Sequence, residues 1–255
     1  MTKTVLDHVA IGTSELTDGW ELFGGVLGGS WVYGGDATGF WWGQLEFGAG
    51  PKIELITPTG GPDSAFLERF LASRGPGAHH LNFVVSDIHA TLSRVRALGI
   101  EPVGVSLLSA TWKEAFLHPK DAHGIVVQVA EQSGPPPELD PPAELGQPGP
   151  ASAFAVVEHQ VADLASATRL FAEALEGEIV SRDSGAAPAV ELTWPNGARL
   201  RLVQAAPESE QSGPGRAGIA TRLRFDRGGA AVSPAELSRA RDLCERLGVS
   251  VELGP

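Results

Sequence analysis

Residues 80–85, which read His-Leu-Asn-Phe-Val-Val, are the first strand of a pattern that the chain has already used once. A helix with apolar side chains at helical spacing is predicted to follow from Ser86 or Asp87 and to end at Gly99. Residues 7–11, Asp-His-Val-Ala-Ile, begin the same order at the start of the chain. Three predicted strands follow each helix, so the pattern is βαβββ, twice, and predicts an α+β fold.

The same opening occurs a third time after a proline-rich segment. Residues 132–150 hold seven of the chain's 19 prolines, and proline fixes φ and removes backbone donors, so this segment is predicted to be an extended linker. Residues 158–162, Glu-His-Gln-Val-Ala, then begin a second half. The sequence therefore predicts a module at 1–131, a linker at 132–150 and a module at 151–255. The second module is predicted to lack counterparts of the last two strands, which are either missing or supplied by a partner chain.

Composition limits the class of protein. The 255 residues are 42% hydrophobic and 20% charged, which is typical of a globular protein rather than a disordered one. The net charge of −12 argues against nucleic acid and anionic membranes as partners, and no apolar run approaches a membrane span. Cys244 is the only cysteine, so we expect a reduced, cytoplasmic protein without a cysteine-based metal cluster.

Four polar side chains occupy matched positions on the predicted strands. His8 precedes Glu54 by 46 positions, and His80 precedes Gln128 by 48. Each half-repeat thus has one such group on its first strand and one on its last. Because strand side chains alternate between faces, the apolar neighbours of these residues are predicted to point to the opposite face.

Two imidazoles, a carboxylate and an amide oxygen form a suitable set of ligands for one divalent metal ion. Manganese, cobalt, nickel, zinc, magnesium and iron all remain open. Two further coordination positions would accept water or a small-molecule substrate. With a single carboxylate, the site would keep a net charge of about +1, which favours negative charge developing on a substrate oxygen.

These stretches resemble the vicinal oxygen chelate superfamily, which includes glyoxalase I, bleomycin-resistance proteins and extradiol dioxygenases. The resemblance covers about 1–131 and is strongest to the methylmalonyl-CoA epimerase branch. The stretches that carry it are 7–11, 52–55, 77–81, 116–120 and 124–128. It implies βαβββ repeats forming cupped, mixed or antiparallel sheets in two modules, with metal ligands at His8, Glu54, His80 and Gln128. It also selects His80 rather than His79 as the ligand.

The chain departs from the epimerase pattern at two places. Epimerases usually have a glutamate where this chain has Gln128, and their catalytic glutamate has no clear match. Either Gln44 or Glu46 could pair beside Glu54 on the same face of a hairpin. If Glu46 is the residue beside Glu54, it is a candidate catalytic base. If Gln44 is that residue, the usual two-base epimerisation is in doubt. Glu54 itself is a second candidate base.

Other residues are assigned to substrate binding or to structure. We expect Trp42, Gln44, Trp112, His118 and Lys120 to contact substrate. In the second half His159 remains, but Arg201 is predicted at the position of Glu54, and Arg222 roughly at that of His80. Because arginine cannot ligate a cation, this half is predicted to be a degenerate module that completes a monomeric pseudo-dimer or a homodimer.

Three functions fit this sequence. The first is a metal-dependent isomerase, epimerase or lyase that acts on an enolisable carbonyl compound through a metal-stabilised enolate. The second is an Fe(II)-dependent oxygenase, because two histidines and one glutamate form the facial set used with iron and dioxygen. The third is a metabolite- or drug-binding protein with a vestigial metal site, which the tryptophan-rich first half would suit.

Overall fold

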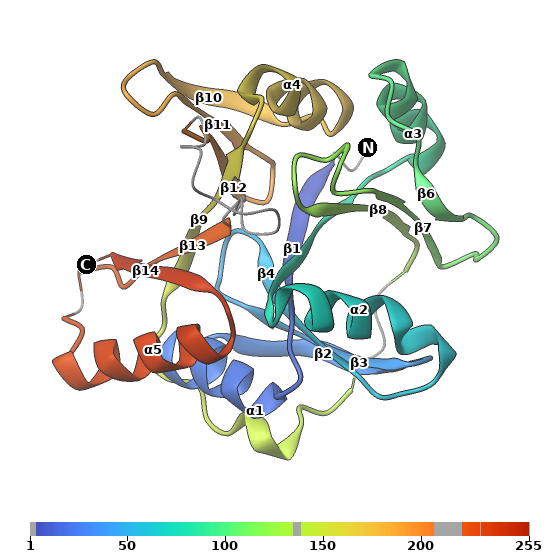
Figure 1. The fold of residues 1–255 in the computed structure, drawn as a ribbon. Helices are drawn as coiled ribbons and strands as arrows, with labels where there is room; N and C mark the ends of the chain where they lie inside the picture. The colour runs from blue at the N-terminus through green and yellow to red at the C-terminus, as the bar shows by residue number, and fades with distance from the viewer. Residues whose placement is uncertain (1–3, 135–138, 207–220, 230, 255) are drawn as a thin grey trace. The chain divides into compact units, whose positions relative to one another are not determined.

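The computed structural model describes residues 4–134, 139–206, 221–229 and 231–254 (Figure 1). Their element order is βαβββ three times, followed by βαβ. The first copy comprises β1 (Val5–Gly12), α1 (Leu16–Gly19) continued by the π-helix η1 (Trp20–Val26), β2 (Ser30–Ala37), β3 (Phe40–Glu46) and β4 (Lys52–Pro58). A 3-10 turn η2 (Pro62–Ser64) and helix α2 (Ala65–Arg74) join it to the second copy.

The remaining elements repeat this order. The second copy comprises β5 (Gly77–Val84), α3 (Ile88–Ala97), β6 (Val103–Ser106), β7 (Trp112–Leu117) and β8 (Val126–Gln132), with η3 (Ala143–Leu145) after it. The third comprises β9 (Ala153–Val161), α4 (Leu164–Arg169) continued by η4 (Leu170–Ala174), β10 (Glu178–Asp183), β11 (Ala189–Thr193) and β12 (Arg199–Gln204). The last elements are β13 (Thr221–Asp226), α5 (Pro234–Arg246) and β14 (Ser250–Gly254). The predicted α+β class is confirmed.

The chain divides into two compact units that do not coincide with the predicted modules. Unit 1 consists of Met1–Leu6, Asn82–Ser133 and Val156–Arg222, and unit 2 consists of Asp7–Leu81, Gly134–Ala155 and Leu223–Pro255. Each unit thus takes residues from both predicted modules. The module boundaries at 131 and 151 stay a prediction.

In unit 2, strands β2, β3, β4, β1 and β5 are neighbours in that order. β2, β3 and β4 are antiparallel, and β4 then pairs with β1 in parallel. One face of this sheet is apolar, and five side chains on it are fully buried: Val9, Ile11, Leu45, Ile53 and Leu55. The opposite face carries His8, Gln44 and Glu54, because side chains alternate along each strand.

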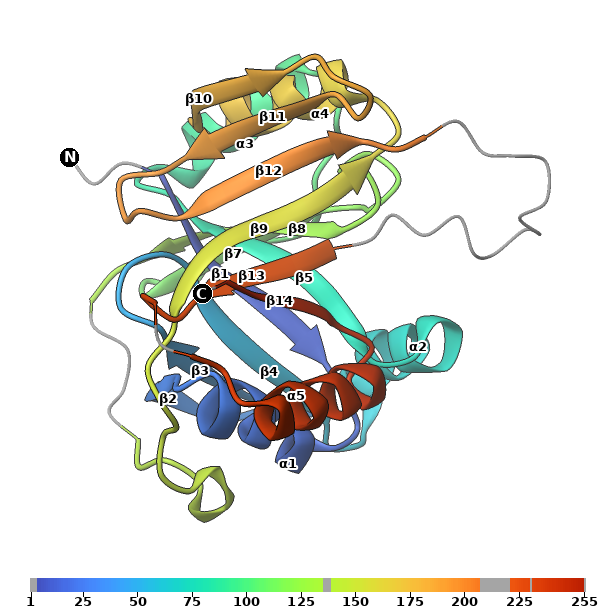
Figure 2. The same cartoon turned by 90° about the vertical axis from the view of Figure 1, so that its left-hand side faces the viewer.

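Helices of unit 2 lie against the apolar face and against one another. Leu55 packs on Gly19 of α1, where a Cβ atom would come within 2.5 Å of Leu55 Cδ1. Helix α5 lies beside α1 and η1 in both views (Figures 1 and 2). Arg246 of α5 binds Asp18 through Nε at 2.8 Å. A proline at the first helical position and a capping box at Ser233 begin α5.

Unit 1 has two antiparallel strand sets. β8 pairs with β7 and β7 with β6, while β10, β11 and β12 form a second set to which β9 adds in parallel. Helix α3 begins at the predicted cap, where the Asp87 carboxylate accepts a hydrogen bond from Ala90 N at 2.9 Å. Of the described residues, no helix is long and apolar enough to span a bilayer.

Leu55→Ala is predicted to destabilise unit 2, because it removes a fully buried side chain directly beside Glu54 on β4. We expect the free energy of unfolding in urea to fall by about 2–5 kcal/mol. The matched control is Leu237→Ala on α5, where the side chain is 42% exposed and the change should stay within about 0.5 kcal/mol. Equal effects of the two changes would contradict this packing.

Candidate metal centre

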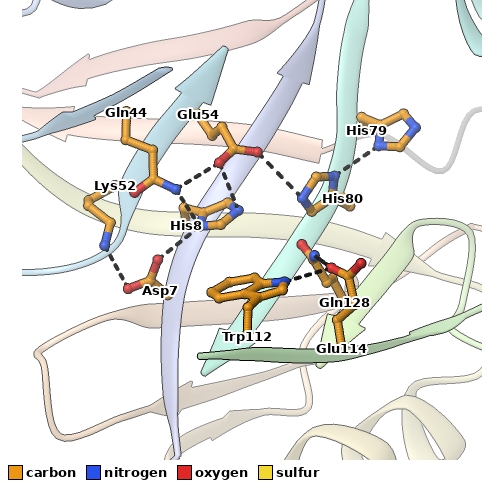
Figure 3. Close-up of polar contacts among 10 residues, drawn as sticks. All are labelled: Asp7, His8, Gln44, Lys52, Glu54, His79, His80, Trp112, Glu114 and Gln128. Carbon is orange, nitrogen blue, oxygen red and sulfur yellow. Dashed lines mark hydrogen bonds and ion pairs between the residues drawn. The ribbon is translucent and has the colours of Figure 1, made fainter. Parts of the chain in front are cut away.

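Three side chains from three strands of unit 2 meet at one point: His8 from β1, Glu54 from β4 and His80 from β5 (Figure 3). Their ligand atoms all lie within 4.8 Å of one another. His8 Nε2 is 3.5 Å from Glu54 Oε2, and His80 Nε2 is 3.8 Å from Glu54 Oε1. The three residues are 3%, 8% and 7% exposed, respectively.

This arrangement fits a divalent ion. Two atoms that each lie about 2.1 Å from one ion are at most about 4.2 Å apart. The distance from each histidine to its nearer Glu54 oxygen is within that range, and the three ligand atoms together lie within 4.8 Å, so a small closure brings all three onto one ion. His8 Nε2 is buried and has no hydrogen-bond partner among the described residues. A buried nitrogen facing a carboxylate requires a proton or a cation between them.

A second contact fixes which nitrogen of His8 faces Glu54. His8 Nδ1 lies 2.8 Å from Asp7 Oδ2, and the other carboxylate oxygen of Asp7 accepts a hydrogen bond from Lys52 Nζ at 2.7 Å. A carboxylate only accepts hydrogen bonds, so the proton of a neutral His8 belongs on Nδ1. The lone pair of Nε2 then points towards Glu54, as a metal-ligating histidine requires.

His80 is held by its neighbour in a similar way. His79 Nδ1 and His80 Nδ1 are 2.9 Å apart, so one of the two rings donates to the other. Burial, with Arg74 adding to it, lowers the pKa of His79 to about 4, which keeps its ring neutral at neutral pH. A hydrogen bond donated by His80 would leave its Nε2 lone pair directed at Glu54. His79 is therefore positioned to hold the ring of His80 in its orientation.

Gln44, and not Glu46, is the residue opposite Glu54. In the β3–β4 register Gln44 pairs with Glu54, and its Nε2 donates to Glu54 Oε2 at 2.7 Å. Glu46 pairs with Ser30 of β2 instead and is exposed. The β3–β4 register thus decides between Gln44 and Glu46, which the sequence left open. It places the amide of Gln44 opposite Glu54, and not the candidate base Glu46.

Two aromatic side chains, Trp42 and Tyr33, lie next to Gln44 in the sheet. Trp42, two positions before Gln44, packs against the buried cluster of Ala10, Ile56 and Leu67. Tyr33 pairs with Gln44 across β2 and β3, and its ring contacts Trp42 edge-on at 5.5 Å between centroids. Burial and the carboxylates of Asp7 and Glu54 raise the pKa of Tyr33, so its hydroxyl keeps its proton.

Tyr33 was not recognised from the sequence as part of this face. It is the only tyrosine of the chain, and the alternation of β2 would have placed it on this face if the β2–β3 register had been known.

Unit 1 contains the other predicted site residues. Gln128 of β8 donates from Nε2 to Glu114 Oε2 at 2.8 Å, and Trp112 Nε1 donates to the same oxygen at 2.9 Å. Glu114 was not identified from sequence, because the β7–β8 register was unknown. His118 is exposed in the turn after β7, where its Nδ1 accepts from Lys120 N at 3.2 Å. Lys120 lines an open cavity of about 270 Å³ with His123 and Arg169.

The second half holds its histidine in a different environment. His159 Nδ1 lies 2.9 Å from Thr221 Oγ1, and its Nε2 lies 3.0 Å from the His123 carbonyl oxygen. Both ring nitrogens thus have partners, and burial lowers the pKa of His159 to about 4. This ring is a neutral, hydrogen-bonded part of the interior of unit 1.

The prediction that Arg201 takes the position of Glu54 is wrong. His8 pairs with Lys52, two residues before Glu54, whereas His159 pairs with Leu202, two residues before Gln204. Gln204 is therefore the counterpart of Glu54, and its Nε2 donates to the Ala162 carbonyl at 2.6 Å.

The two arginines of this half face a carboxylate instead. Arg201 and Arg222 lie 3.7 Å and 3.3 Å from the carboxylate oxygens of Glu158, respectively. They thus form ion pairs at the surface of unit 1.

Asp7→Asn is predicted to remove a pH-dependent part of the stability. Burial alone would raise the pKa of Asp7, but the bonds to His8 and Lys52 outweigh it and lower the pKa from 3.8 to about 2. The ionised carboxylate therefore contributes about 2 kcal/mol above pH 3.8, and this contribution is lost as the pH falls towards 2.

Urea unfolding at several pH values measures this contribution. The difference between wild type and Asp7→Asn should shrink as the pH falls through this window. The exposed Asp36→Asn on β2 is the matched control and should show no such change. A difference between wild type and Asp7→Asn that is independent of pH would contradict the assigned contacts.

Comparison with known proteins finds a family model that matches part of the chain. A family model described as the glyoxalase/bleomycin resistance protein/dioxygenase superfamily matches residues 7–116. The matched segment begins one residue before His8 and includes Glu54 and His80. A comparison with curated protein sequences finds no match.

Solved structures with a similar fold include a mutant of 4-hydroxymandelate synthase from Streptomyces coelicolor. It has a TM-score of 0.61 and 15% identity over 96% of this chain and 76% of that chain. A likeness at this identity concerns the fold alone, and it extends over nearly the whole chain.

Two further structures match about half of this chain. Methylmalonyl-CoA epimerase from Mycobacterium tuberculosis is 29% identical over 52% of this chain and 94% of that chain, with a TM-score of 0.45. A hypothetical protein from Bacillus halodurans is 26% identical over 54% of this chain and 100% of that chain, with a TM-score of 0.47.

Proposed function

We propose that this chain, whose residues 7–116 belong to the glyoxalase/bleomycin resistance protein/dioxygenase superfamily, is a divalent-metal-dependent isomerase, epimerase or lyase of an enolisable carbonyl compound. The superfamily includes both epimerases and dioxygenases, so membership alone does not select a reaction. The observation that carries the proposal is the buried convergence of His8, Glu54 and His80. A cation held there would supply Lewis acidity for negative charge that develops on substrate oxygens.

The charge of this group supports a reaction through an anionic transition state. Glu54 is its only carboxylate, and the facing residue on β3 is the neutral Gln44. Two positive charges from the ion and one negative charge from Glu54 leave about +1 at the centre. A second carboxylate at position 44 would neutralise that charge and weaken the attraction for an enolate.

Glu54 is the residue that we assign to proton transfer. Gln44 donates to its Oε2 and so fixes the plane of the carboxylate. The nearby Asp7 is bound to Lys52 and stays ionised to about pH 2, which makes it a poor base at neutral pH. With Gln44 as a neighbour, the reaction has one base rather than two.

The remaining predicted residues enter the proposal as follows. Gln128 is proposed as a fourth, neutral ligand through its carbonyl oxygen. We propose Trp42, Gln44, Trp112, His118 and Lys120 as contacts for a small-molecule substrate. Gln44 is 2% exposed, and its Oε1 has no hydrogen-bond partner among the described residues, so it suits a hydroxyl or enol donor.

A cytoplasmic location, and a monomeric pseudo-dimer or homodimer, also stay predictions.

A second candidate is an Fe(II)-dependent oxygenase. The specific observation in its favour is that the three converging residues are two histidines and one carboxylate, the facial set of non-haem iron oxygenases. In that case Gln128 would be a neighbour rather than a ligand. The two candidates differ in their requirement for dioxygen.

Exchange of substrate hydrogen for solvent deuterium tests the first candidate. We expect protein loaded with Mn²⁺ or Co²⁺ to incorporate deuterium next to the carbonyl of an activated acid or thioester, as read by mass spectrometry. Glu54→Gln keeps the shape of the side chain but removes the base, and should slow exchange by about 10²- to 10⁴-fold. His89→Ala, an exposed histidine on α3, is the matched control and should exchange at the wild-type rate.

The same preparations distinguish the alternatives. Oxygen consumption by anaerobically Fe(II)-loaded protein, without deuterium exchange, would replace the isomerase with the oxygenase. Exchange that persists after chelation of the metal would contradict both. Tight binding of substrate analogues that chelators do not change, without turnover, would favour a binding protein.

A further inference from the structure

One tyrosine lies on the face of unit 2 that carries the metal group, and it belongs neither to the ligand set nor to the proposed base. Tyr33 on β2 pairs with Gln44 on β3, and Gln44 pairs with Glu54 on β4. Because cross-strand partners point to the same face of a sheet, a phenol, an amide and a carboxylate form one row across three neighbouring strands. The row ends at Glu54, a member of the metal group.

A break in the β2–β3 register, of the kind that a β-bulge produces, allows Tyr33 to reach this face. Trp31 pairs with Leu45 on the apolar face, whereas Tyr33 pairs with Gln44 on the polar face. The two aromatic residues are two positions apart, and in a regular strand they would share one face. The ring of Trp31 instead lies 6.1 Å from that of Trp20 in η1. Bulges beside functional sites commonly re-aim a side chain in this way.

Two contacts hold the Tyr33 ring in place. The ring of Trp42 meets it edge-on, with an angle of 80° between the ring planes. On another side, Lys52 Nζ lies over the ring at 5.7 Å from its centroid, which is within the range of a cation–π contact. The same ammonium group donates to Asp7, whose carboxylate orients the ring of His8. The position of Tyr33 is thus linked to that of a metal ligand.

The hydroxyl of Tyr33, unlike its ring, has no hydrogen-bond partner among the residues that the structure describes. The side chain is half-buried rather than enclosed. Burial and the charges of Asp7 and Glu54 raise the pKa of this phenol, so its hydroxyl stays protonated. The nearby cation, Lys52, is already bonded to Asp7 at 2.7 Å. Tyr33 therefore offers a neutral and unoccupied donor beside the metal group.

We propose that Tyr33 is a catalytic residue whose hydroxyl donates a hydrogen bond to the substrate oxygen on which negative charge develops. The inference rests on the proposed metal-dependent function and adds a residue to it. In that reaction Glu54 takes a proton from the carbon next to the carbonyl, and the electron pair of the C–H bond moves to the carbonyl oxygen. Tyr33 keeps its proton, and its hydrogen bond strengthens as this oxygen becomes an anion. Glu54 then returns a proton to carbon.

A neutral donor suits a centre that already has a net charge of about +1. A second cation in its place would repel the metal ion, and a carboxylate would repel the substrate oxygen. A phenol does neither, so the affinity for metal should not depend on the hydroxyl of Tyr33. The affinity for an anion bound beside the metal should depend on it.

Oxalate is the probe for this difference, because two of its oxygen atoms can chelate a metal ion while the others accept hydrogen bonds. Its affinity for Zn²⁺-loaded protein is measured by calorimetry, and the affinity for Zn²⁺ by competition with a chromophoric chelator. Tyr33→Phe removes the hydroxyl and keeps the ring. Oxalate should then bind about tenfold or more weakly, because a hydrogen bond to a charged group is lost. The affinity for Zn²⁺ should stay unchanged.

Trp31→Phe is the matched control, since it removes a hydrogen-bond donor from the same strand on the opposite face. Trp31 Nε1 donates to the carbonyl oxygen of Leu139 at 2.9 Å, so this change should leave the affinity for oxalate unchanged. In the deuterium-exchange assay, Tyr33→Phe should lower kcat by about 10²- to 10³-fold, and Trp31→Phe should exchange at the wild-type rate.

Two results would overturn the role of Tyr33 and leave the metal-dependent function standing. The first is equal oxalate affinity and equal exchange in wild type and Tyr33→Phe. The second is a loss of Zn²⁺ affinity in Tyr33→Phe that is as large as its loss of oxalate affinity, which would mean that the hydroxyl supports the structure of the site.

A spectroscopic measurement tests the contact without turnover. Tyr33 is the only tyrosine of the chain, so 3-fluorotyrosine incorporated during expression labels this position alone. Its ¹⁹F resonance should shift when oxalate binds to the Zn²⁺-loaded protein, and should not move when oxalate is added without metal. A resonance that ignores bound oxalate would contradict the proposed contact. Absence of Zn²⁺ binding by the wild type would instead overturn the proposed function, and with it the role of Tyr33.

Discussion

The contact between the Glu54 carboxylate and the two imidazole rings that close on it is the constraint on which the site depends. Nothing in the Glu54–His8 contact supplies a proton, since the proton of a neutral His8 is on Nδ1, which donates to the Asp7 carboxylate. Placing these groups together at exposures below a tenth of their surface is unfavourable without a positive charge among them. The sheet of unit 2 holds these groups in place. The side chains buried on its opposite, apolar face stabilise that sheet.

The supporting contacts all favour a cation over a single proton. Asp7 bonded to Lys52 directs one nitrogen of His8 inwards, and His79 contacts the outer nitrogen of His80. Gln44 directs its amide nitrogen at Glu54 and keeps that carboxylate in one plane. Such outer contacts orient metal ligands and tune their basicity. A site that held only a shared proton would not require three ligand groups that are each oriented by a separate contact.

Alternation along strands was enough to predict which residues share the polar face. His8, Glu54 and His80 were found because they occupy matched positions on the predicted strands of the two half-repeats, and the structure brings them together. The βαβββ order followed from apolar periodicity and from helix ends, and it is also observed. Hairpin register could not be derived, because the turn after β3 is rich in glycine and permits more than one pairing. The predicted positions of Gln44, Glu46 and Arg201 depended on the strand register. Tyr33 and Glu114 were missed because the same register was unknown.

Metal stoichiometry tests the central claim, that His8, Glu54 and His80 hold one divalent ion, most directly. Protein purified without a metal-affinity step is analysed by plasma mass spectrometry, as wild type, His80→Ala and the exposed-histidine control His89→Ala. We expect close to one equivalent of a divalent first-row metal in wild type and control, and its loss in His80→Ala. Equal metal content in all three proteins, or none in the wild type after reloading, would contradict it.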